Sequence, residues 1–408
     1  MNIKKVLFSL MAFLLVSVPL KPQSYADSEI ISVEKGQVIV EKLMVMELDF
    51  LMEWNDRVYI ICTVEKLLRI EQANIPYVLE TLNFYPFNQK DVSVKGGING
   101  DYHSYKELET DLIALENSYP HLAKVFDIGN SLEKRNIYAL KISDNVNLDE
   151  GEAEVFFVGC HHAREWISVE VPFLIGKYLV ENYEKSTRIK ELVDQSEIWI
   201  VPLLNPDGLE YSIHVYRYWR KNRRNNSDGT YGVDLNRNYS YNWGYDDEGS
   251  SPHPSSGTYR GTSPFSEPET QVIRDFFAQR NLQAALSYHN YSQIILYPWS
   301  YTTEATNRDE LLDEMASEMS RLMKDVNGSF YGYGQAGSYL YLSNGDTADW
   351  AFGTYGIPSF TIELPPVDVL HGGFFNAEED IRSIFEENLP AALFLIDWSI
   401  KNFGVRPS

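Results

Sequence analysis

The chain has 408 residues, of which 44% are hydrophobic and 13% aromatic. This length and composition are typical of a globular protein with more than one folding unit and exclude a disordered chain. The formal net charge of -23 argues against nucleic acid as a partner, because binding a phosphate backbone requires a basic face.

The chain begins with the features of a secretory signal peptide. Two lysines precede the apolar run Val6–Val18, and Ser24 and Ala26 place small residues at the positions that a signal peptidase reads. We therefore expect residues 1–26 to be removed and the product to be secreted and extracellular. The apolar run is shorter than the roughly 20 residues of a membrane span, so we expect no membrane attachment.

The next stretch, residues 27–98, is predicted to form a small α+β unit. Gln37–Leu43 alternates apolar and polar residues, and Arg57–Val64 is a second predicted strand. A helical pattern starts at about Glu65, and the glycine-rich residues 96–100 mark a flexible break. We interpret 27–98 as a removable pro-segment; an ordinary N-terminal domain is the alternative.

Cys62 and Cys160 are the only cysteines. An exported protein of this size with two cysteines does not depend on a disulfide framework. Because Cys62 lies in the predicted removable segment, we expect two free buried thiols. Cys160 precedes His161 and His162, but neighbouring residues on a strand point to opposite faces, which disfavours a thiol catalyst.

The remaining residues, 99–408, alternate strand and helix patterns. This alternation predicts one α/β domain in which a mixed central β-sheet is flanked by helices. Nearly continuous apolar runs are typical of strands covered on both faces. Four such runs are present: Glu154–Gly159, Glu197–Leu204, Gln283–Tyr288 and Pro358–Leu364.

Helix starts in this domain are predicted from capping patterns. Ser104–Glu107 and Ser266–Glu269 each have the serine and glutamate spacing of a capping box, and the second is expected to open a helix through Arg280. A long C-terminal helix is predicted from near Asn376 to about Lys401, with a kink or restart at Pro390.

Potential metal ligands follow two of the apolar strands. His162 and Glu165 come just after the strand ending at Gly159, and His289 directly follows the strand Gln283–Tyr288. Ligands gather beyond the carboxyl ends of strands in open α/β sheets. The three side chains can therefore form a zinc site with a fourth position open to water. Taken alone, His162 and Glu165 could also be a helix-surface pair.

Further motifs follow in a fixed order along the chain. With the two above they are His162–Trp166, Asn205–Gly208, Trp219–Arg223, Gly232–Asn238, Ser287–His289, Tyr341, Asp349–Trp350 and Thr361–Leu364. This set, over roughly residues 101–402, resembles the zinc metallocarboxypeptidase family. The signal peptide and the segment Asn344–Trp350 make it most similar to bacterial carboxypeptidase T.

The resemblance implies a catalytic centre with one Zn²⁺ ion per chain. His162, Glu165 and His289 would be the zinc ligands, and the neighbouring His161 would face away from the metal. Glu363 would be the general base for a zinc-activated water. Arg223 would polarise the scissile carbonyl and hold the developing oxyanion.

The resemblance also implies how a substrate is held. Arg237 would form a two-pronged salt bridge with the terminal carboxylate of a peptide, assisted by Asn236 and Tyr341. Such a contact defines an exopeptidase, because only a chain end supplies that carboxylate. Asp234 would orient His162 from behind, and Arg164 would assist on the outer side of the cleft.

The preference for the departing residue is predicted from the segment Tyr341–Asp349. Ala348 is small and neither demands nor excludes a basic side chain. Asp346 matches an acidic position of carboxypeptidase T, so we predict acceptance of both apolar and basic C-terminal residues. The alternative for Asp346 is a turn residue after Gly345.

Tyr245–Glu248 is an acidic loop that is a candidate for a structural Ca²⁺ site, because calcium prefers clustered oxygens. A solvated acidic loop without calcium is the other interpretation.

Two rival functions remain at this point. One is a hydrolase of the same fold that cuts cell-wall peptides at γ-D-glutamyl bonds. The other is a non-catalytic peptide-binding homologue, which the presence of all ligands and of Glu363 disfavours. The expected partners are peptide or protein C-termini, with neither nucleic acid nor membrane, and we expect a monomer.

Overall fold

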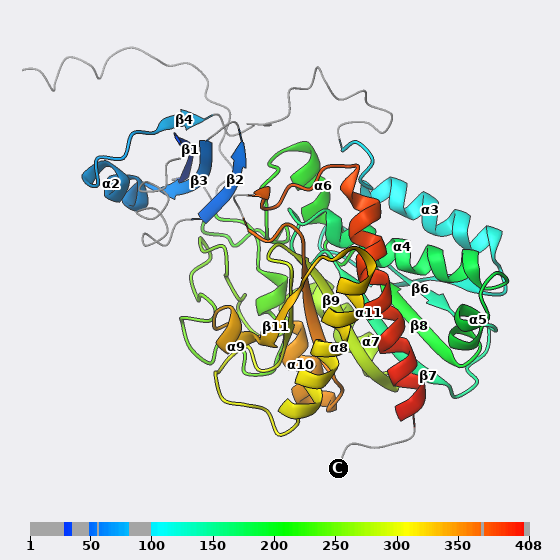
Figure 1. Ribbon diagram of the computed structural model, residues 1–408. Helices are drawn as coiled ribbons and strands as arrows, with labels where there is room; N and C mark the ends of the chain where they lie inside the picture. The colour runs from blue at the N-terminus through cyan, green and yellow to red at the C-terminus, as the bar shows by residue number, and fades with distance from the viewer. Residues whose placement is uncertain (1–27, 35–48, 55–56, 81–98, 369–370, 404–408) are drawn as a thin grey trace, which may run out of the picture.

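The computed structural model describes residues 28–34, 49–54, 57–80, 99–368 and 371–403. They form a small N-terminal unit and a large α/β domain (Figure 1). The predicted signal peptide and the predicted strand Gln37–Leu43 lie outside the described residues. Among the helices that are described, none is long and apolar enough to cross a membrane.

The described residues of the N-terminal unit form a four-stranded antiparallel sheet and one helix. Its sheet order is β2-β3-β1-β4, and Ile31, Val58, Ile60 and Ile70 pack in its core. The unit is α+β, as predicted from the sequence. Its elements are β1 (Ser28–Glu34), β2 (Asp49–Trp54), β3 (Arg57–Thr63), α2 (Val64–Gln72) and β4 (Val78–Glu80).

The large domain contains a mixed eight-stranded sheet, which confirms the predicted fold class. The central strands β8, β7, β9 and β12 run parallel. β6 pairs antiparallel with both β5 and β8, while β10 pairs antiparallel with β12 and parallel with β11. The sheet order is β11-β10-β12-β9-β7-β8-β6-β5. The strands are β5 (Ala123–Asn130), β6 (Asn136–Ile142), β7 (Ala153–Gly159), β8 (Ser196–Val201), β9 (Leu282–Asn290), β10 (Ile294–Tyr297), β11 (Gly332–Gln335) and β12 (Ser359–Leu364).

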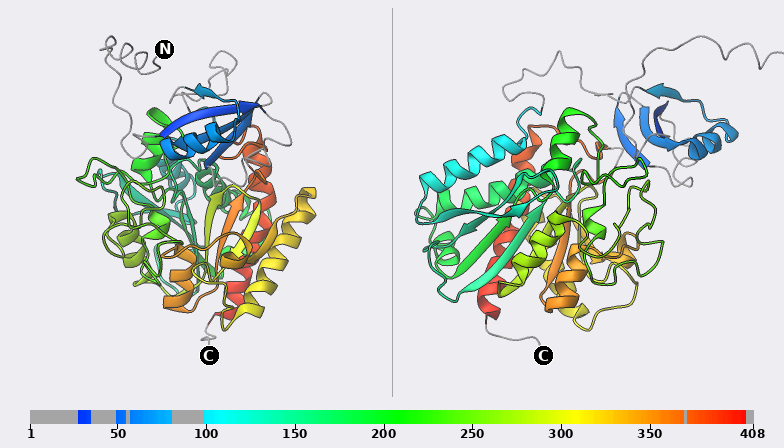
Figure 2. Two further views of the ribbon diagram at one scale, coloured as in Figure 1. Left: turned by 90° about the vertical axis from the view of Figure 1, so that its left-hand side faces the viewer. Right: turned by 180° about the vertical axis from the view of Figure 1, so that it is seen from behind.

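Helices cover both faces of this sheet (Figure 2). Side chains of α3, α4, α5, α8 and α11 pack on one face, and side chains of α7 and α10 pack on the other. Removing apolar surface from water on both faces is the main stabilising contribution. The helices are α3 (Tyr105–Ser118), α4 (Ile167–Asn182), α5 (Thr187–Val193), α6 (Pro206–His214), η3 (Leu235–Arg237), α7 (Pro268–Phe277), α8 (Asp309–Asn327), α9 (Ala336–Tyr339), α10 (Thr347–Tyr355) and α11 (Asp380–Asn402).

One of the two predicted capping boxes is present. Ser104 and Glu107 form the reciprocal box that opens α3. The prediction for Ser266 is wrong: Glu267 is the N-cap residue of α7, and its side chain makes no capping hydrogen bond. The Ser266 hydroxyl instead accepts from Asn238 Nδ2 at 2.9 Å and donates to Glu267 Oε1 at 2.8 Å.

Two further predictions can be compared with the structure. The C-terminal helix α11 begins at Asp380 rather than near Asn376 and includes Pro390 within one continuous element. Cys62 and Cys160 are both buried and free, as expected.

Candidate metal centre and active site

The candidate site lies at the carboxyl ends of three parallel strands. β7 ends at Gly159, and β9 and β12 place His289 and Glu363 side by side in register. After Gly159 the chain turns sharply at Cys160, whose φ is 55°. Gly159 must lack a side chain, because a Cβ there would lie 1.9 Å from the backbone oxygen of Ser168. This close approach brings the turn with His162 and Glu165 beside β9.

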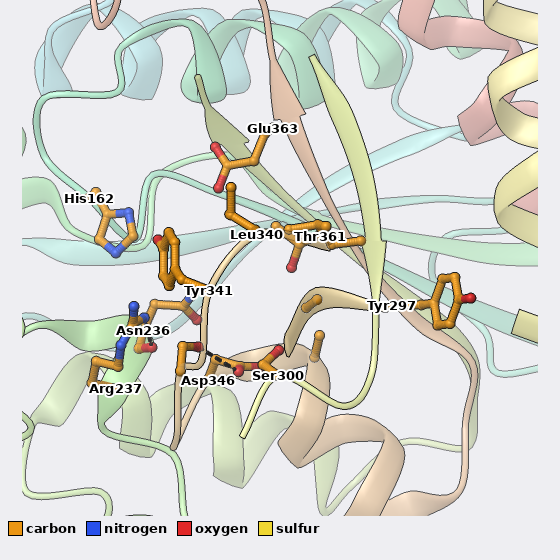
Figure 3. Close-up of a pocket in the computed structure, with 14 residues that line it drawn as sticks. His162, Asn236, Arg237, Tyr297, Ser300, Leu340, Tyr341, Asp346, Thr361 and Glu363 are labelled. Atoms are coloured by element: carbon orange, nitrogen blue, oxygen red, sulfur yellow. Dashed lines mark hydrogen bonds between the residues drawn. The ribbon is translucent and has the colours of Figure 1, made fainter. Parts of the chain in front are cut away.

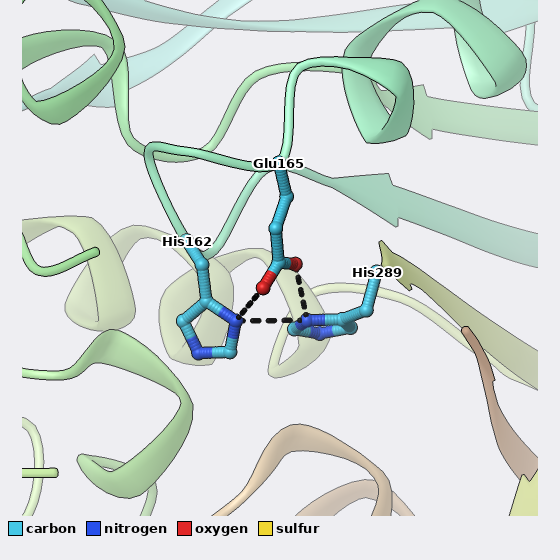
Figure 4. A group of neighbouring side chains, drawn as sticks. All are labelled: His162, Glu165 and His289. Carbon is cyan, nitrogen blue, oxygen red and sulfur yellow. Dashed lines mark hydrogen bonds and ion pairs between the residues drawn. The ribbon is translucent and has the colours of Figure 1, made fainter. Parts of the chain in front are cut away.

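The three predicted metal ligands converge on one point (Figure 4). Nδ1 of His162 lies 2.8 Å from Glu165 Oε1. Nδ1 of His289 lies 3.0 Å from Glu165 Oε2 and 3.1 Å from Nδ1 of His162. All three side chains are buried, and their ligand atoms lie within 4.8 Å of one another.

The hydrogen bonds around this group fit a bound cation. Nε2 of His162 lies 3.1 Å from Asp234 Oδ1, and a carboxylate can only accept, so the ring proton is on Nε2. The lone pair of Nδ1 then faces both Glu165 and the second imidazole. Such a buried cluster of electron-pair donors requires a positive charge between its members. Two imidazole nitrogens and one carboxylate are the ligand set that suits Zn²⁺ with an open position.

The charges around the group differ between its two glutamates. Burial alone would raise the pKa of Glu165, but the adjacent His162 and His289 outweigh burial and hold that pKa well below its usual range. Burial raises the pKa of Glu363 to about 8; Glu165 adds to the rise, while His289 and two arginines oppose it. Glu165 is therefore suited to coordination as a carboxylate, and Glu363 to holding a proton near neutral pH.

The structure corrects the prediction that Arg223 lies beside the metal ligands. Its guanidinium stacks on an aromatic group away from them, with the carbon of the guanidinium 3.5 Å from the ring centroid of Tyr211 and 4.6 Å from that of Trp219. Arg220 takes the expected place, since its Nη1 lies 4.0 Å from Glu165 Oε1.

Arg220 is fixed in that place by Asp234. Its Nε and Nη2 both donate to Asp234 Oδ2, at 3.0 and 2.9 Å. Asp234 thus contacts both His162 and Arg220 and orients the two relative to each other. The sequence pattern could not distinguish the two arginines, because both Arg220 and Arg223 belong to the motif Trp219–Arg223. In the structure Arg223 stacks on the buried Trp219, while Arg220 turns toward the site.

A pocket opens next to the metal group (Figure 3). Arg237 is buried in its wall, where Nε donates to the Gly249 oxygen at 3.0 Å and Nη1 to the Asn236 oxygen at 2.8 Å. These bonds fix the plane of the guanidinium, and in the part of the chain that the structure describes Nη2 has no hydrogen-bond partner and can meet a ligand. The lining residues are His162, Asn236, Arg237, Leu296, Tyr297, Ser300, Ala336, Leu340, Tyr341, Ser343, Asp346, Ala348, Thr361 and Glu363.

Tyr341, Asp346 and Ala348 all reach this pocket, as predicted from the sequence. Tyr341 is 54% exposed, so its ring is free to contact an incoming ligand. Asp346 is buried and is also the N-cap residue of α10, since Oδ1 accepts from the Asp349 nitrogen at 2.9 Å. Its Oδ2 accepts from the Ser343 hydroxyl at 3.1 Å. Asp346 is therefore both a pocket residue, as predicted, and the N-cap of a helix; the alternative prediction was a turn residue after Gly345.

Arg164 lies on another side of the same site. The carbon of its guanidinium is 3.8 Å from the ring centroid of Phe374. Phe374 in turn packs edge-on against Tyr291, with centroids 4.9 Å apart. This aromatic contact holds the arginine at the rim, where a positive charge can meet a carbonyl of a bound chain.

The acidic loop Tyr245–Glu248 is occupied by contacts within the protein. Asp246 Oδ1 accepts from the backbone nitrogen of Gly249 at 2.7 Å and from Asn344 Nδ2 at 2.8 Å. Asp247 forms an ion pair with Arg260 at 2.8 Å. Within the described ranges, no group of three potential ligands is found in this loop. These contacts connect the loop to the segment that carries Arg237 and Asp346.

The chain is similar to known proteins over most of its length. The family model for "zinc carboxypeptidase" matches residues 108–391. A zinc carboxypeptidase of Saccharothrix mutabilis subsp. capreolus is 33% identical over 357 residues, which are 81% of this chain and 78% of that protein. Carboxypeptidase B of Astacus astacus is 34% identical over 294 residues, which are 70% of this chain and 93% of that protein.

Solved structures give the same result. Bovine thrombin-activatable fibrinolysis inhibitor, in complex with tick carboxypeptidase inhibitor, has a TM-score of 0.67 and 31% identity, with 74% of this chain and 98% of that chain covered. A structure of thrombin-activatable fibrinolysis inhibitor has a TM-score of 0.74 and 26% identity, with 92% of this chain and 99% of that chain covered.

Proposed function

The chain belongs to the zinc carboxypeptidase family and is a zinc-dependent metallocarboxypeptidase; we propose that it removes single residues from peptide C-termini with the residues described above. The observation that carries the proposal is the position of the three convergent ligands beside Glu363, Arg220 and a pocket that contains Arg237. The proposed zinc ligands are His162, Glu165 and His289.

Glu363 is the proposed general base. Its carboxyl group is next to His289 in the strand register and lines the pocket. A bound zinc ion supplies Lewis acidity, which makes a water molecule acidic enough to react near neutral pH. Glu363 takes the proton from that water and returns it to the amine of the departing residue. A carboxyl group with a raised pKa is suited to both steps.

Arg220 is proposed for the role that the sequence pattern gave to Arg223. A guanidinium beside the metal ligands stabilises negative charge that develops on the carbonyl oxygen during attack. Because Asp234 holds Arg220 by two hydrogen bonds, little reorganisation is needed when that charge appears. Arg164, at the rim, assists with the carbonyl of the preceding residue.

Arg237 and Asn236 are proposed to hold the terminal carboxylate. Among the hydrogen bonds of the described residues, the side-chain N–H groups of Arg237 and Asn236 have no carboxylate partner. A substrate carboxylate supplies the missing charge, and desolvation strengthens such a pair. Tyr341, exposed at the mouth, covers the bound end. The substrate must therefore present a free α-carboxylate.

Asp346 and Ala348 are proposed to select the departing side chain. Ala348 leaves room for a long side chain, and the Asp346 carboxylate can accept from a lysine or arginine at the pocket floor. The apolar lining from Leu296 and Ala336 also favours aliphatic residues. We therefore propose that the enzyme releases both apolar and basic C-terminal residues.

Residues 27–98 are proposed to be a pro-segment of a secreted zymogen. Tyr59 on β3 is 2% exposed and packs with Ala163, Tyr216, Tyr218, Trp219 and Phe375 of the large domain. Ala163 directly follows His162, so this contact covers the chain beside the metal ligands. Mass spectrometry of the secreted product tests the proposal: an N-terminus near residue 99 supports removal, and one at Asp27 contradicts it.

A comparison of free and blocked chain ends tests the proposed function as a whole. The enzyme is assayed on a peptide ending in leucine and on its C-terminal amide, with zinc present, chelated and restored. We expect release of leucine from the free acid only, and only with zinc. Equal hydrolysis of the amide, or internal cleavage, would overturn the assignment of Arg237.

A further inference from the structure

His161 is a buried histidine that the proposed mechanism does not use. It precedes the ligand His162 and is 0% exposed. Its ring stacks on the ligand His289, with centroids 5.3 Å apart and planes 18° apart. Its two nitrogens point to polar partners away from the metal group. Nδ1 lies 3.3 Å from the Ser287 hydroxyl, and Nε2 lies 2.8 Å from the Thr347 hydroxyl and 2.9 Å from the Tyr239 hydroxyl.

Thr347 connects His161 to Asn236 in the pocket. Asn236 Oδ1 accepts two hydrogen bonds from this one residue, from the backbone nitrogen at 3.0 Å and from the hydroxyl at 2.8 Å. A backbone N–H can only donate, so the carboxamide oxygen must face Thr347. The amide nitrogen Nδ2 is then the atom that Asn236 can present to the pocket.

The direction of the remaining hydrogen bond follows from the proton count. The Thr347 hydroxyl has one proton, which it donates to Asn236 Oδ1, so its oxygen accepts from His161 Nε2. His161 therefore has its ring proton on Nε2, where the oxygens of Thr347 and Tyr239 share it as acceptors, and its Nδ1 accepts from Ser287. The protons run in one direction, from Nε2 of His161 through the Thr347 hydroxyl to the oxygen of Asn236.

We propose that His161 is a positioning residue for substrate recognition, which acts through Thr347 to keep the Asn236 amide donor turned toward the carboxylate of the substrate. This inference rests on the proposed role of Asn236 and deepens it. The stacking of His161 on His289 gives the chain of hydrogen bonds a fixed origin beside the metal ligands. The position of Asn236, which is proposed to bind the substrate carboxylate, is thereby fixed relative to the metal ligands.

The hydrogen-bond donor can be removed while the ring is kept. His161→Phe retains a planar ring against His289 and has no Nε2 donor. His161→Gln carries an amide nitrogen near the place of Nε2 and restores the donor. Thr347→Val removes the connecting hydroxyl at nearly constant volume and leaves His161 in place, so it remains informative if His161→Phe does not fold.

The expected result is a change in KM rather than in kcat. For peptides with a free C-terminal carboxylate, His161→Phe and Thr347→Val each raise KM about tenfold, the effect of losing one well-oriented hydrogen bond to a charged group. We expect kcat to stay within about twofold, since uniform binding affects KM alone. His161→Gln returns KM toward that of the wild type, and every variant retains the wild-type zinc content.

A double-mutant cycle separates positioning from a general structural role. In an Asn236→Ala background, His161→Phe should raise KM no further, because the group that it orients is gone. The inference would be overturned if His161→Phe raised KM further in the Asn236→Ala background. It would also be overturned if KM were unchanged in both His161→Phe and Thr347→Val, or if the main effect of these variants were loss of zinc. Failure of the proposed function itself is recognised separately, because the wild type would then hydrolyse the amide as well as the free acid.

Discussion

The Nδ1 atoms of His162 and His289 lie 3.1 Å apart although 127 positions separate them in the sequence. Parallel pairing of β7 with β9 sets this distance, because Gly159 and Tyr288 are partners in register. The two histidines follow those partners at the same edge of the sheet. The order of the strands thus places the proposed ligands close together: His162 and Glu165 follow the buried strand β7, and His289 lies on the buried strand β9.

Arg220 and Arg223 form a matched pair for testing the site of oxyanion stabilisation. Arg220→Ala is expected to lower kcat by about a hundredfold to a thousandfold, the usual effect of removing one such donor. Arg223→Ala removes an aromatic stacking contact instead and should leave kcat within a few-fold of the wild type. Steady-state kinetics with parallel zinc determination provide the measurement. Equal losses in the two variants would contradict the placement of Arg220.

Glu363→Gln tests the general base. The amide has the same shape but cannot take up a proton, so kcat should fall by a factor on the order of 10² to 10⁴. Zinc content should not change, because Glu363 is outside the ligand group. Glu152→Gln is the control. Its pKa is also raised, to about 7, by burial and nearby acids, but it precedes β7 at the opposite end of the sheet. A Glu363→Gln variant with normal kcat would exclude this role.

Asp346→Asn tests the basis of side-chain preference. Asparagine caps a helix as well as aspartate does, so α10 should remain intact while the pocket loses its charge. We expect kcat/KM for peptides ending in arginine or lysine to fall by about tenfold or more, the cost of losing a buried ionic partner. Peptides ending in leucine should be hardly affected. An unchanged ratio of arginine to leucine hydrolysis would show that Asp346 only caps the helix.

His103 predicts a pH dependence of stability away from the active site. Burial lowers its pKa, but Glu170 and Asp111 outweigh burial and raise it to about 9. Because the folded-state pKa exceeds the unfolded value of about 6.5, the stabilisation is complete below pH 6.5 and is lost as the pH rises through 9. The loss should amount to roughly 2–3 kcal/mol.

Denaturant unfolding at pH 6 and pH 9.5 measures this effect of His103. In His103→Gln, the free energy of unfolding should change less between these two pH values. His371→Gln, which changes an exposed histidine paired with Asp368, should leave it as in the wild type. If the free energy of unfolding changed equally with pH in the wild type and in His103→Gln, His103 could not be the source of the pH dependence.

The sequence predicted the central strands well, and the structure brings together the three side chains that were proposed as metal ligands. Both predictions depend on local patterns. An apolar run followed by His162 and Glu165 is visible in the sequence, and so is the one ending before His289. The choice between Arg220 and Arg223 was not visible. It is seen only in tertiary contacts, namely the two hydrogen bonds of Arg220 to Asp234 and the stacking of Arg223 on Tyr211.

The start of α7 was also predicted incorrectly from the sequence, because the side chains of the predicted capping box form other hydrogen bonds. At α7 the Ser266 hydroxyl bonds the Glu267 carboxylate, and Glu269 accepts from the backbone nitrogen of Leu132 at 3.0 Å. Asn222 Nδ2 donates to the second oxygen of Glu269 at 3.2 Å, and Asn238 Nδ2 donates to the Ser266 oxygen at 2.9 Å. Both side chains are therefore turned to partners outside the predicted box. At α10 the sequence did not show that Asp346 would cap the helix and line the pocket at once.

Zinc content measured by mass spectrometry of the native protein tests the metal centre most directly, because His161 and His162 are adjacent and only one of them is a proposed ligand. We expect one zinc ion per chain in the wild type and in His161→Gln, and none in His162→Ala. Zinc retained by His162→Ala, or lost from His161→Gln in a folded protein, would contradict the convergence of His162, Glu165 and His289 on a single ion.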